Sequence, residues 1–209
     1  MRDYFVSCIG SRAVRATFTF RAFAPLRLCV MFLVAVCCAQ SVRGEVTAER
    51  VNGAIANAVT FLEKQQRPDG AWFELESEPG GVTALVTLAL LNSGRTSQSE
   101  SVKKALAYLE RKPEPDHTYN TSLMIMAFVQ ADAKKYAGTV QRLALALASR
   151  QIRGDDISKG GWNYGGLGTG TPADNSNTQF AMLALHEAER AGVKIPDQTW
   201  QLAYNYWTQ

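Results

Sequence analysis

The sequence predicts an all-α protein, and the alternation of two kinds of segment carries that prediction. Segments with apolar residues at helical spacing alternate with segments that are apolar on nearly every side. Strand signals are nearly absent, because the short β-branched stretches fit helical periodicity better. We therefore expect amphipathic outer helices that alternate with buried inner helices from residue 48 to the last residue, 209.

Residues 1–44 differ from the rest and have the composition of a signal peptide or an N-terminal anchor. Five arginines precede an uncharged apolar run, residues 28–39, which is shorter than the about 20 residues of a membrane-spanning helix. A basic segment, a short apolar segment and small residues are typical of a secretory signal. We expect cleavage after Ala39 or Gly44 and a secreted or periplasmic protein. The alternative is an uncleaved leader that anchors the chain in a membrane through residues 28–39.

The global charge and the cysteines belong largely to this leader. Residues 1–44 hold six of the 22 basic and one of the 19 acidic side chains, which leaves residues 45–209 with a formal net charge of −2. The sequence therefore gives no reason to expect binding to nucleic acid. All four cysteines also lie in the leader, so residues 45–209 have no disulfide and no thiolate metal site.

Residues 45–209 read as one domain of repeated helix pairs. Outer helices are expected at residues 49–66, 99–112, 136–150 and 199–209, and inner helices at 80–91, 120–128 and 175–186. Gly94 is expected just after the end of the first inner helix, and the third inner helix is expected to stop near Gly192. The inner helices align on one threonine, so their core positions recur. Equivalent buried positions are expected at Leu88, Met126 and Leu183.

A turn signal follows the first outer helix. Pro68 ends that helix because it removes a backbone donor and disfavours helical geometry at the preceding residue. Asp69 and Gly70 supply a tight turn, and Trp72 follows as a large apolar anchor whose N–H needs a partner. Gln65 stands five residues before Gly70. The third turn repeats part of this pattern in Gly160, Gly161 and Trp162.

The order aromatic, Gln65, Gly70, Trp72 resembles the QW motif of the squalene cyclase/prenyltransferase repeat family. This resemblance covers about residues 48–209 and implies an α/α toroid, which is a ring of helix pairs around a central cavity. The chain would supply an incomplete ring of about three and a half helix hairpins, apparently truncated at its C-terminus. The resemblance is specific for fold and uninformative for function, because the relatives have many activities.

The catalytic motifs of that family are absent from this sequence. It has no Asp-x-Asp-Asp acid motif, no Asp-Asp-x-x-Asp magnesium motif and no Cys-Gly-Glu-Gln thioester motif. The only acidic doublet, Asp155-Asp156, lies in a polar loop. Without a cysteine in residues 45–209, the zinc set of the protein prenyltransferases cannot be assembled. We expect no metal and no cofactor, and the sequence leans against an enzyme.

A candidate ligand-binding rim is expected where outer helices turn into inner ones. Aromatic rings beside amide and carboxylate groups suit a sugar or a peptide. The candidates are His117, Tyr119, Asn120, Trp162, Tyr164, Asp174, Asn175, Asn177 and Gln179. The competing interpretation is structural, because such residues also cap helices and tie repeats together. A purely structural role is expected for Gln65, Asp69, Gly70, Trp72 and Gly161.

Two function classes follow from the sequence. The first is an exported binding or structural interaction module without a catalytic centre. The second is a terpenoid cyclase-like, prenyltransferase-like or polysaccharide lyase-like toroid enzyme whose catalytic repeats are missing or unrecognised here. Expected partners are a second copy of the chain or another toroid-repeat chain, and expected ligands are a sugar, a peptide or an isoprenoid. A membrane is expected as a partner only through an uncleaved leader.

Overall fold

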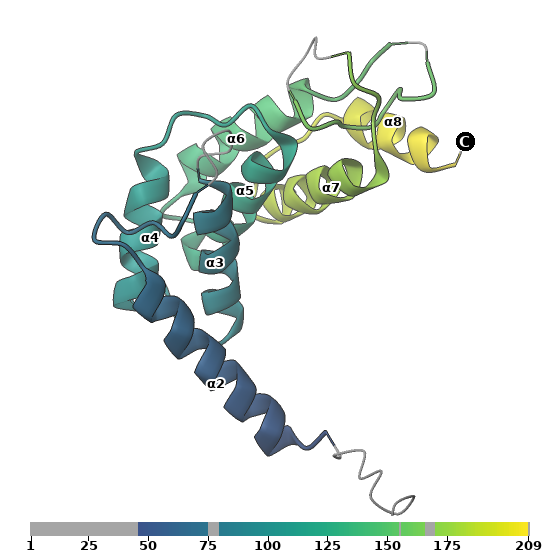
Figure 1. The fold of residues 1–209 in the computed structure, drawn as a ribbon. Coiled ribbons are helices and arrows are strands. Elements are labelled where there is room, and N and C mark those ends of the chain that lie inside the picture. Colours follow the sequence, from purple (N-terminus) through teal and green to yellow (C-terminus); the bar gives the residue numbers. More distant parts are fainter. Residues whose placement is uncertain (1–45, 75–79, 155, 166–169, 209) are drawn as a thin grey trace, which may run out of the picture. The chain divides into compact units, whose positions relative to one another are not determined.

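The computed structural model describes residues 46–74, 80–154, 156–165 and 170–208. The chain divides into two units, Met1–Thr47 and Ala48–Gln209, and all described helices belong to the second. The described residues contain seven α-helices and no strand, which confirms the all-α class (Figure 1). The predicted leader, residues 1–44, lies outside the described residues.

The seven helices coincide with the seven expected segments, and their ends differ by a few residues. The expected outer helices are α2 (Ala48–Gln65), α4 (Glu100–Glu110), α6 (Ala137–Ser149) and α8 (Asp197–Trp207). The expected inner helices are α3 (Gly81–Asn92), α5 (Thr118–Asp132) and α7 (Asn175–Arg190). The inner helix α5 begins earlier and ends later than expected, whereas α7 stops close to Gly192 as expected.

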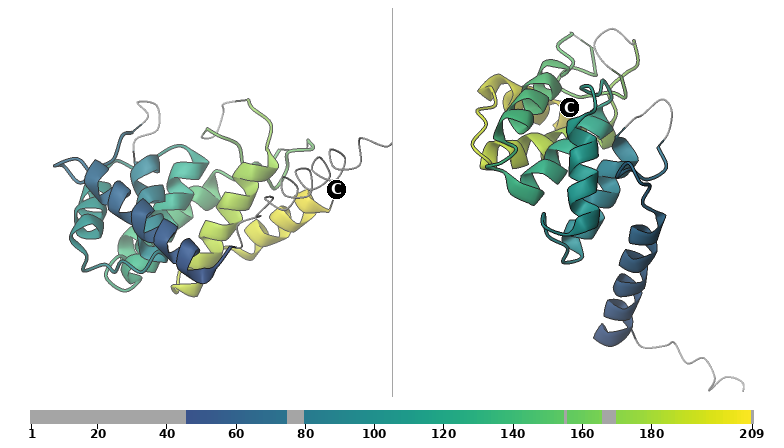
Figure 2. Two further views of the ribbon diagram at one scale, coloured as in Figure 1. Left: turned by 60° about the horizontal axis from the view of Figure 1, so that its bottom comes forward. Right: turned by 90° about the vertical axis from the view of Figure 1, so that its left-hand side faces the viewer.

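The inner helices form one layer, in which α5 lies between α3 and α7 and packs against both (Figures 1 and 2). Helix α4 packs on α3, and α6 packs on both α5 and α7. The core between these helices contains large side chains that are almost fully buried, such as Phe128, Leu143 and Trp162. Buried alanines on α5 and α7, Ala127 and Ala184, allow the inner helices to approach closely.

Glycines end two of the inner helices in the expected way. Gly94 follows α3 with a φ of 91°, and the amide of Arg95 donates to the carbonyl of Leu90 at 3.0 Å. Gly192 follows α7 with a φ of 99°, and the amide of Val193 donates to Ala188 at 3.0 Å. Both are left-handed caps that satisfy carbonyls at a helix end.

The two ends of the inner layer differ from its middle. Leu88 and Met126 were expected to be buried; they are partly buried and pack against the core. Leu183 was expected to be equally buried, but 47% of it is exposed. Leu85 on α3 is 54% exposed. The prediction fails for Leu183 because α7 has an inner neighbour on one side only within the described residues.

Helix α2 is anchored at its C-terminal end. Of its side chains only Val59 is buried, whereas Val51 and Ile55 on its apolar face are exposed. The anchor is a bidentate ion pair in which the guanidinium of Arg95 contacts the carboxylate of Glu63 at 2.7 and 3.0 Å. The N-terminal turns of α2 therefore present an amphipathic helix without an apolar neighbour among the described residues.

Candidate functional site

The turn between α2 and α3 is closed by side-chain amide and indole groups. The side-chain Nε2 of Gln66 donates to the carbonyls of Gly70 at 2.9 Å and of Ser101 at 2.8 Å. The indole Nε1 of Trp72 donates to the carbonyl of Leu62 at 2.7 Å, and its backbone amide donates to Thr83 Oγ1 at 3.2 Å. Trp72 is only 4% exposed, so its role in this turn is structural.

The turn between α6 and α7 repeats the same contacts with different residues. Gln151 Nε2 donates to the carbonyls of Gly160 and Thr199, both at 2.9 Å. Trp162 Nε1 donates to the carbonyl of Leu147 at 2.8 Å, and the Trp162 amide donates to Thr178 Oγ1 at 3.0 Å. The first and third hairpins are thus copies of one structural unit, despite the longer third turn.

The glutamine of this motif is Gln66, and the expected assignment to Gln65 is wrong. Gln65 is exposed, whereas Gln66 makes both carbonyl contacts. The aromatic spacing favoured Gln65, but the side chain one position later points toward Gly70. Asp69 is exposed and its Oδ1 accepts from the amide of Ala71 at 3.1 Å, which shapes the turn locally.

The glycines of the two turns lie against the next outer helix. Gly70 and Gly160 have φ values of 96° and 94°, a region that favours glycine. A Cβ at Gly160 would overlap with the carbonyl of Leu202, and one at Gly70 would overlap with the carbonyl of Lys104. Gly161 is buried, so its expected structural role agrees with its position.

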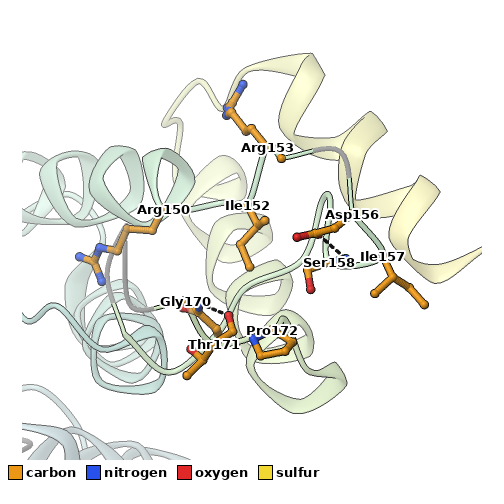
Figure 3. Close-up of a pocket in the computed structure, with 11 residues that line it drawn as sticks. Arg150, Ile152, Arg153, Asp156, Ile157, Ser158, Gly170, Thr171 and Pro172 are labelled. Atoms are coloured by element: carbon orange, nitrogen blue, oxygen red, sulfur yellow. Dashed lines mark hydrogen bonds between the residues drawn. The ribbon is translucent and has the colours of Figure 1, made fainter.

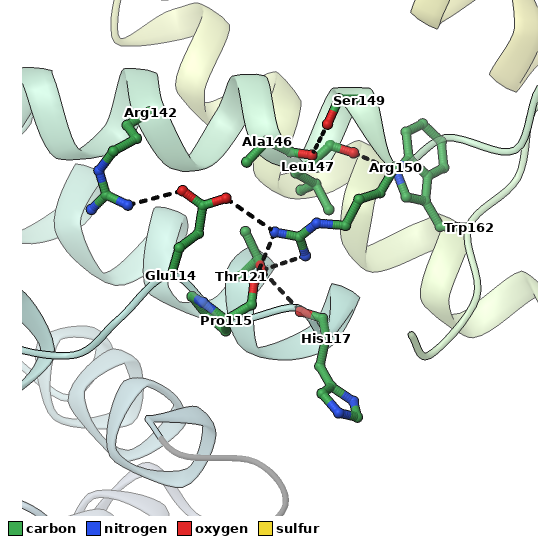
Figure 4. Close-up of polar contacts among 10 residues, drawn as sticks. All are labelled: Glu114, Pro115, His117, Thr121, Arg142, Ala146, Leu147, Ser149, Arg150 and Trp162. Atoms are coloured by element: carbon green, nitrogen blue, oxygen red, sulfur yellow. Dashed lines mark hydrogen bonds and ion pairs between the residues drawn. The ribbon is translucent and has the colours of Figure 1, made fainter. Parts of the chain in front are cut away.

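The second turn lacks a tryptophan and uses an arginine instead (Figure 4). Arg150 Nη1 donates to Thr121 Oγ1 at 2.9 Å, and Nη2 donates to the carbonyl of Pro115 at 2.7 Å. Thr121 aligns with Thr83 and Thr178, whose hydroxyls accept from tryptophan amides in the other turns. Arg150 therefore supplies from its side chain the donor that a backbone amide supplies to the equivalent threonine in the other two turns.

The surroundings of Arg150 balance its buried charge. Its side chain is 9% exposed, and Glu114 lies 3.7 Å from Nη2. Glu114 also pairs with Arg142 at 3.0 Å. Burial lowers the pKa of Arg150, while the negative charges of Glu114 and Asp116 oppose that shift. Both terminal nitrogens of the guanidinium have protein partners, so the role of this cluster is structural.

Four of the nine expected rim residues are part of the framework. Trp162 and Asn177 are fully buried, and Asn120 is 2% exposed with its side chain against Gly81. Asp174 caps α7, because its Oδ1 accepts from the Asn177 amide at 2.8 Å. Burial raises the pKa of Asp174, but the hydrogen bonds from Ser176 and Asn177 together bring it below its usual value.

The remaining rim candidates are accessible in part. The rings of Tyr119 and Tyr164 lie 5.7 Å apart between centroids, and Tyr119 lies 4.7 Å from Phe180. Asn175 Oδ1 accepts from the hydroxyl of Tyr206 at 3.0 Å, which ties α7 to α8. His117 is partly buried at the start of α5, and Figure 4 shows its ring turned away from Arg150. Gln179 is exposed on α7.

A pocket of about 450 Å³ lies beside the long third turn (Figure 3). Its polar side chains are already engaged. Arg153 Nη1 donates to Gln198 Oε1 at 3.0 Å, and Asp156 Oδ1 accepts from the Ser158 amide at 2.8 Å. Arg150 turns its guanidinium away from the pocket, toward Glu114. These hydrogen bonds hold the side chains of Arg153 and Asp156 against neutral groups of the same chain.

A second hollow is an apolar groove of about 370 Å³ between α7 and α8. Leu183 and Trp207 on its walls are 47% and 44% exposed. Trp207 Nε1 donates to the Met182 sulfur at 3.0 Å, which fixes the groove's width. The groove is lined by Gln179, Met182, Leu183, His186, Trp200 and Trp207. Of these, only Gln179 is a binding residue that the sequence predicts, because apolar positions of a helix are expected to lie in the core.

Within the described residues, no cluster of three or more His, Asp or Glu side chains could hold a metal ion. In the same part of the chain, no helix is long and apolar enough to span a membrane. Comparisons with family models, curated proteins and solved structures found no match to this chain.

Proposed function

We propose that residues 48–208 are an interaction module built from squalene cyclase/prenyltransferase-type repeats, which binds a polypeptide through the uncovered ends of its helix layer. The observation that carries the proposal is the groove between α7 and α8. Exposed leucine and tryptophan side chains line it, and they lie on the two helices α7 and α8. Exposed apolar surface of this kind is typical of protein-binding sites.

The repeated Gln, Gly, Trp and Thr contacts support the assignment to this repeat type. The two complete copies place a glutamine, a left-handed glycine and a tryptophan in equivalent hydrogen bonds. We propose that the hairpins form part of an α/α toroid, and that residues 1–44 export or anchor the chain. Fractionation and N-terminal sequencing test the export proposal. A start near residues 40–45 outside the cytoplasm supports it, and a full-length cytosolic protein contradicts it.

The geometry offers less to a cyclase-like enzyme. Acid-initiated cyclisation needs a carboxyl group that is kept protonated in an apolar pocket. No Asp or Glu among the described residues is buried. Asp174, the carboxyl at the start of α7, has a lowered pKa, which is opposite to the shift that such an acid requires. Binding therefore accounts for the described residues better than catalysis.

Site-specific photo-cross-linking in cells that make the protein tests the binding proposal. A photoreactive amino acid replaces Leu183 or Trp207 in the groove, and Lys194 in the exposed α7–α8 connection is the control position. We expect a discrete cross-linked polypeptide from both groove positions and none from position 194. The absence of a product at positions 183 and 207 would contradict an interaction function for the groove.

A further inference from the structure

Each inner helix has two apolar stripes, one toward the inner helix before it and one toward the inner helix after it. We call these the N-side and C-side stripes. On α5, the N-side stripe is Asn120, Leu123, Met124 and Ala127, and all four residues are buried. The C-side stripe of α5 is Ser122, Ile125, Met126 and Val129, which are buried or packed against the core.

The same positions are covered on the sides of α3 and α7 that face α5. The C-side stripe of α3 is Ala84, Thr87, Leu88 and Leu91, and the N-side stripe of α7 is Asn177, Phe180, Ala181 and Ala184. All eight residues are buried or packed against the core. The contacts agree, because Asn120 lies against Gly81 of α3, and Tyr119 of α5 contacts Phe180 of α7. Equivalent helix positions are therefore buried at the α3–α5 contact and at the α5–α7 contact.

Neither of the two outermost stripes faces another inner helix among the described residues. The N-side stripe of α3 is Val82, Leu85, Val86 and Ala89, of which Leu85 and Ala89 are exposed. The C-side stripe of α7 is Gln179, Met182, Leu183 and His186, of which only Met182 is partly buried. The second stripe forms one wall of the α7–α8 groove.

The α3–α4 pair is the counterpart of the α7–α8 pair, and its neighbours show what can cover the α7–α8 groove. Two residues of α8 that line the groove are Trp200 and Trp207. The matching glutamine contacts to Ser101 and Thr199 align α4 with α8, so Trp200 and Trp207 correspond to Val102 and Leu109. Those two residues are 0% and 1% exposed. The surface of the α3–α4 pair that is equivalent to the groove is thus covered, because the N-side stripe of α5 packs against α3.

We propose that the α7–α8 groove binds α3 of a second copy of this chain, head to tail. The N-side stripe of α3 is equivalent to the N-side stripe of α5. Because the stripe of α5 covers the surface of the α3–α4 pair that is equivalent to the groove, the stripe of α3 is suited to cover the groove itself. Helix α2 carries further exposed apolar residues, Val51 and Ile55. The inference rests on the proposed function and names its partner. Such a contact joins two different faces, so it closes into a ring or continues as a filament.

Charge substitutions at the two faces test this interface by sedimentation of the purified full-length chain. Leu85→Glu places a charge on the α3 stripe and Leu183→Glu places one in the groove. Both side chains are about half exposed, so each variant keeps its core, which circular dichroism checks. Leu145→Glu is the matched control, because Leu145 is 43% exposed on α6, outside both stripes. Leu85→Ala and Leu183→Ala remove apolar area without adding charge.

We expect the wild type and Leu145→Glu to show at least twice the monomer mass, and each stripe variant to lose that association. An equimolar mixture of Leu85→Glu and Leu183→Glu should regain a mass of two chains. The first variant still offers an intact groove, and the second still offers an intact α3 stripe. Leu85→Ala and Leu183→Ala should each weaken association less than the glutamate substitution at the same position. A variant with both Leu85→Glu and Leu183→Glu should not associate.

Three results would overturn the head-to-tail inference. The first is a monomeric wild type at every concentration reached. The second is failure of the mixture to recover after either variant alone has lost association, which would indicate a symmetric contact. The third is a groove cross-link to a different protein instead of a second copy. The third result would leave the proposed interaction function standing, whereas the absence of any groove cross-link would contradict both.

Discussion

The side-chain amide of Gln151 donates to the backbone carbonyl of Thr199 at 2.9 Å. Gln66 makes the same contact to Ser101 at 2.8 Å. In both hairpins, a glutamine just beyond one outer helix holds the first turn of the next outer helix, and the intervening inner helix is enclosed between them. This contact is the link between successive repeats, so its removal should loosen the stack at a defined place.

Replacing Gln66 with alanine should destabilise the chain by about 2–3 kcal/mol, because two carbonyls lose their donor. Gln65→Ala is the matched control, since Gln65 is the neighbouring, exposed glutamine and should change stability by no more than about 0.5 kcal/mol. Urea denaturation of both variants measures the difference. Equal effects of the two substitutions would show that the motif glutamine is misassigned.

Gly160→Ala should destabilise by about 2–4 kcal/mol, because an added Cβ meets the carbonyl of Leu202 and forces α8 to move. Gly94→Ala has the same backbone strain, with a φ of 91°, but open space around its Cβ. That control should lose only about 1 kcal/mol. Thermal or urea denaturation compares the two, and a loss at Gly94 as large as at Gly160 would contradict the close approach of α8.

Arg150→Met should destabilise by about 2–3 kcal/mol, because Thr121 and the carbonyl of Pro115 lose a charged donor in a buried site. Arg150→Lys should recover only part of this loss, since a lysine cannot reproduce the two-pronged contact. Arg142→Met is the control, because Arg142 pairs with the same Glu114 but is half exposed. A neutral Arg150→Met would mean that the second turn has another support.

Asp174→Ala should destabilise by about 1 kcal/mol near neutral pH, because α7 loses its N-cap. The folded-state pKa of Asp174 lies below its usual value, so its contribution is complete above the usual pKa and is lost as pH falls through the folded-state pKa. Asp174→Asn keeps a capping acceptor and should lack this dependence. Denaturation at several pH values tests the sign, and a gap that grows on acidification would contradict it.

The sequence predicted the helices well because their signals are local. Periodicity identified all seven segments, and Gly94 marked the end of α3 as expected. The burial of Trp72 follows from its size and from the need of its N–H for a partner. The structural alternative also held for Asp174, which caps α7.

The failures depend on neighbours in space, which periodicity does not report. Gln65 and Gln66 are adjacent and chemically identical, and only the positions of the Gly70 and Ser101 carbonyls in the fold distinguish them. Leu183 has a core pattern but lies at the open side of α7. Arg150 belongs to no sequence motif. Its contact with Thr121 becomes apparent only when the three turns are compared and the second is found to lack a tryptophan. The signal that could have corrected the assignment of Gln65 is the second glutamine, Gln151, which precedes Gly160 in the third turn.

Hydroxyl-radical footprinting of the protein in its native assembly tests whether a partner covers the α7–α8 groove. Leu183 and Leu145 are exposed to a similar extent in the single chain, at 47% and 43%. We predict that Leu183 is oxidised much less than Leu145 in the assembly, and that dilution to monomer makes the two equal. Equal oxidation of Leu183 and Leu145 in the undiluted assembly would contradict the account.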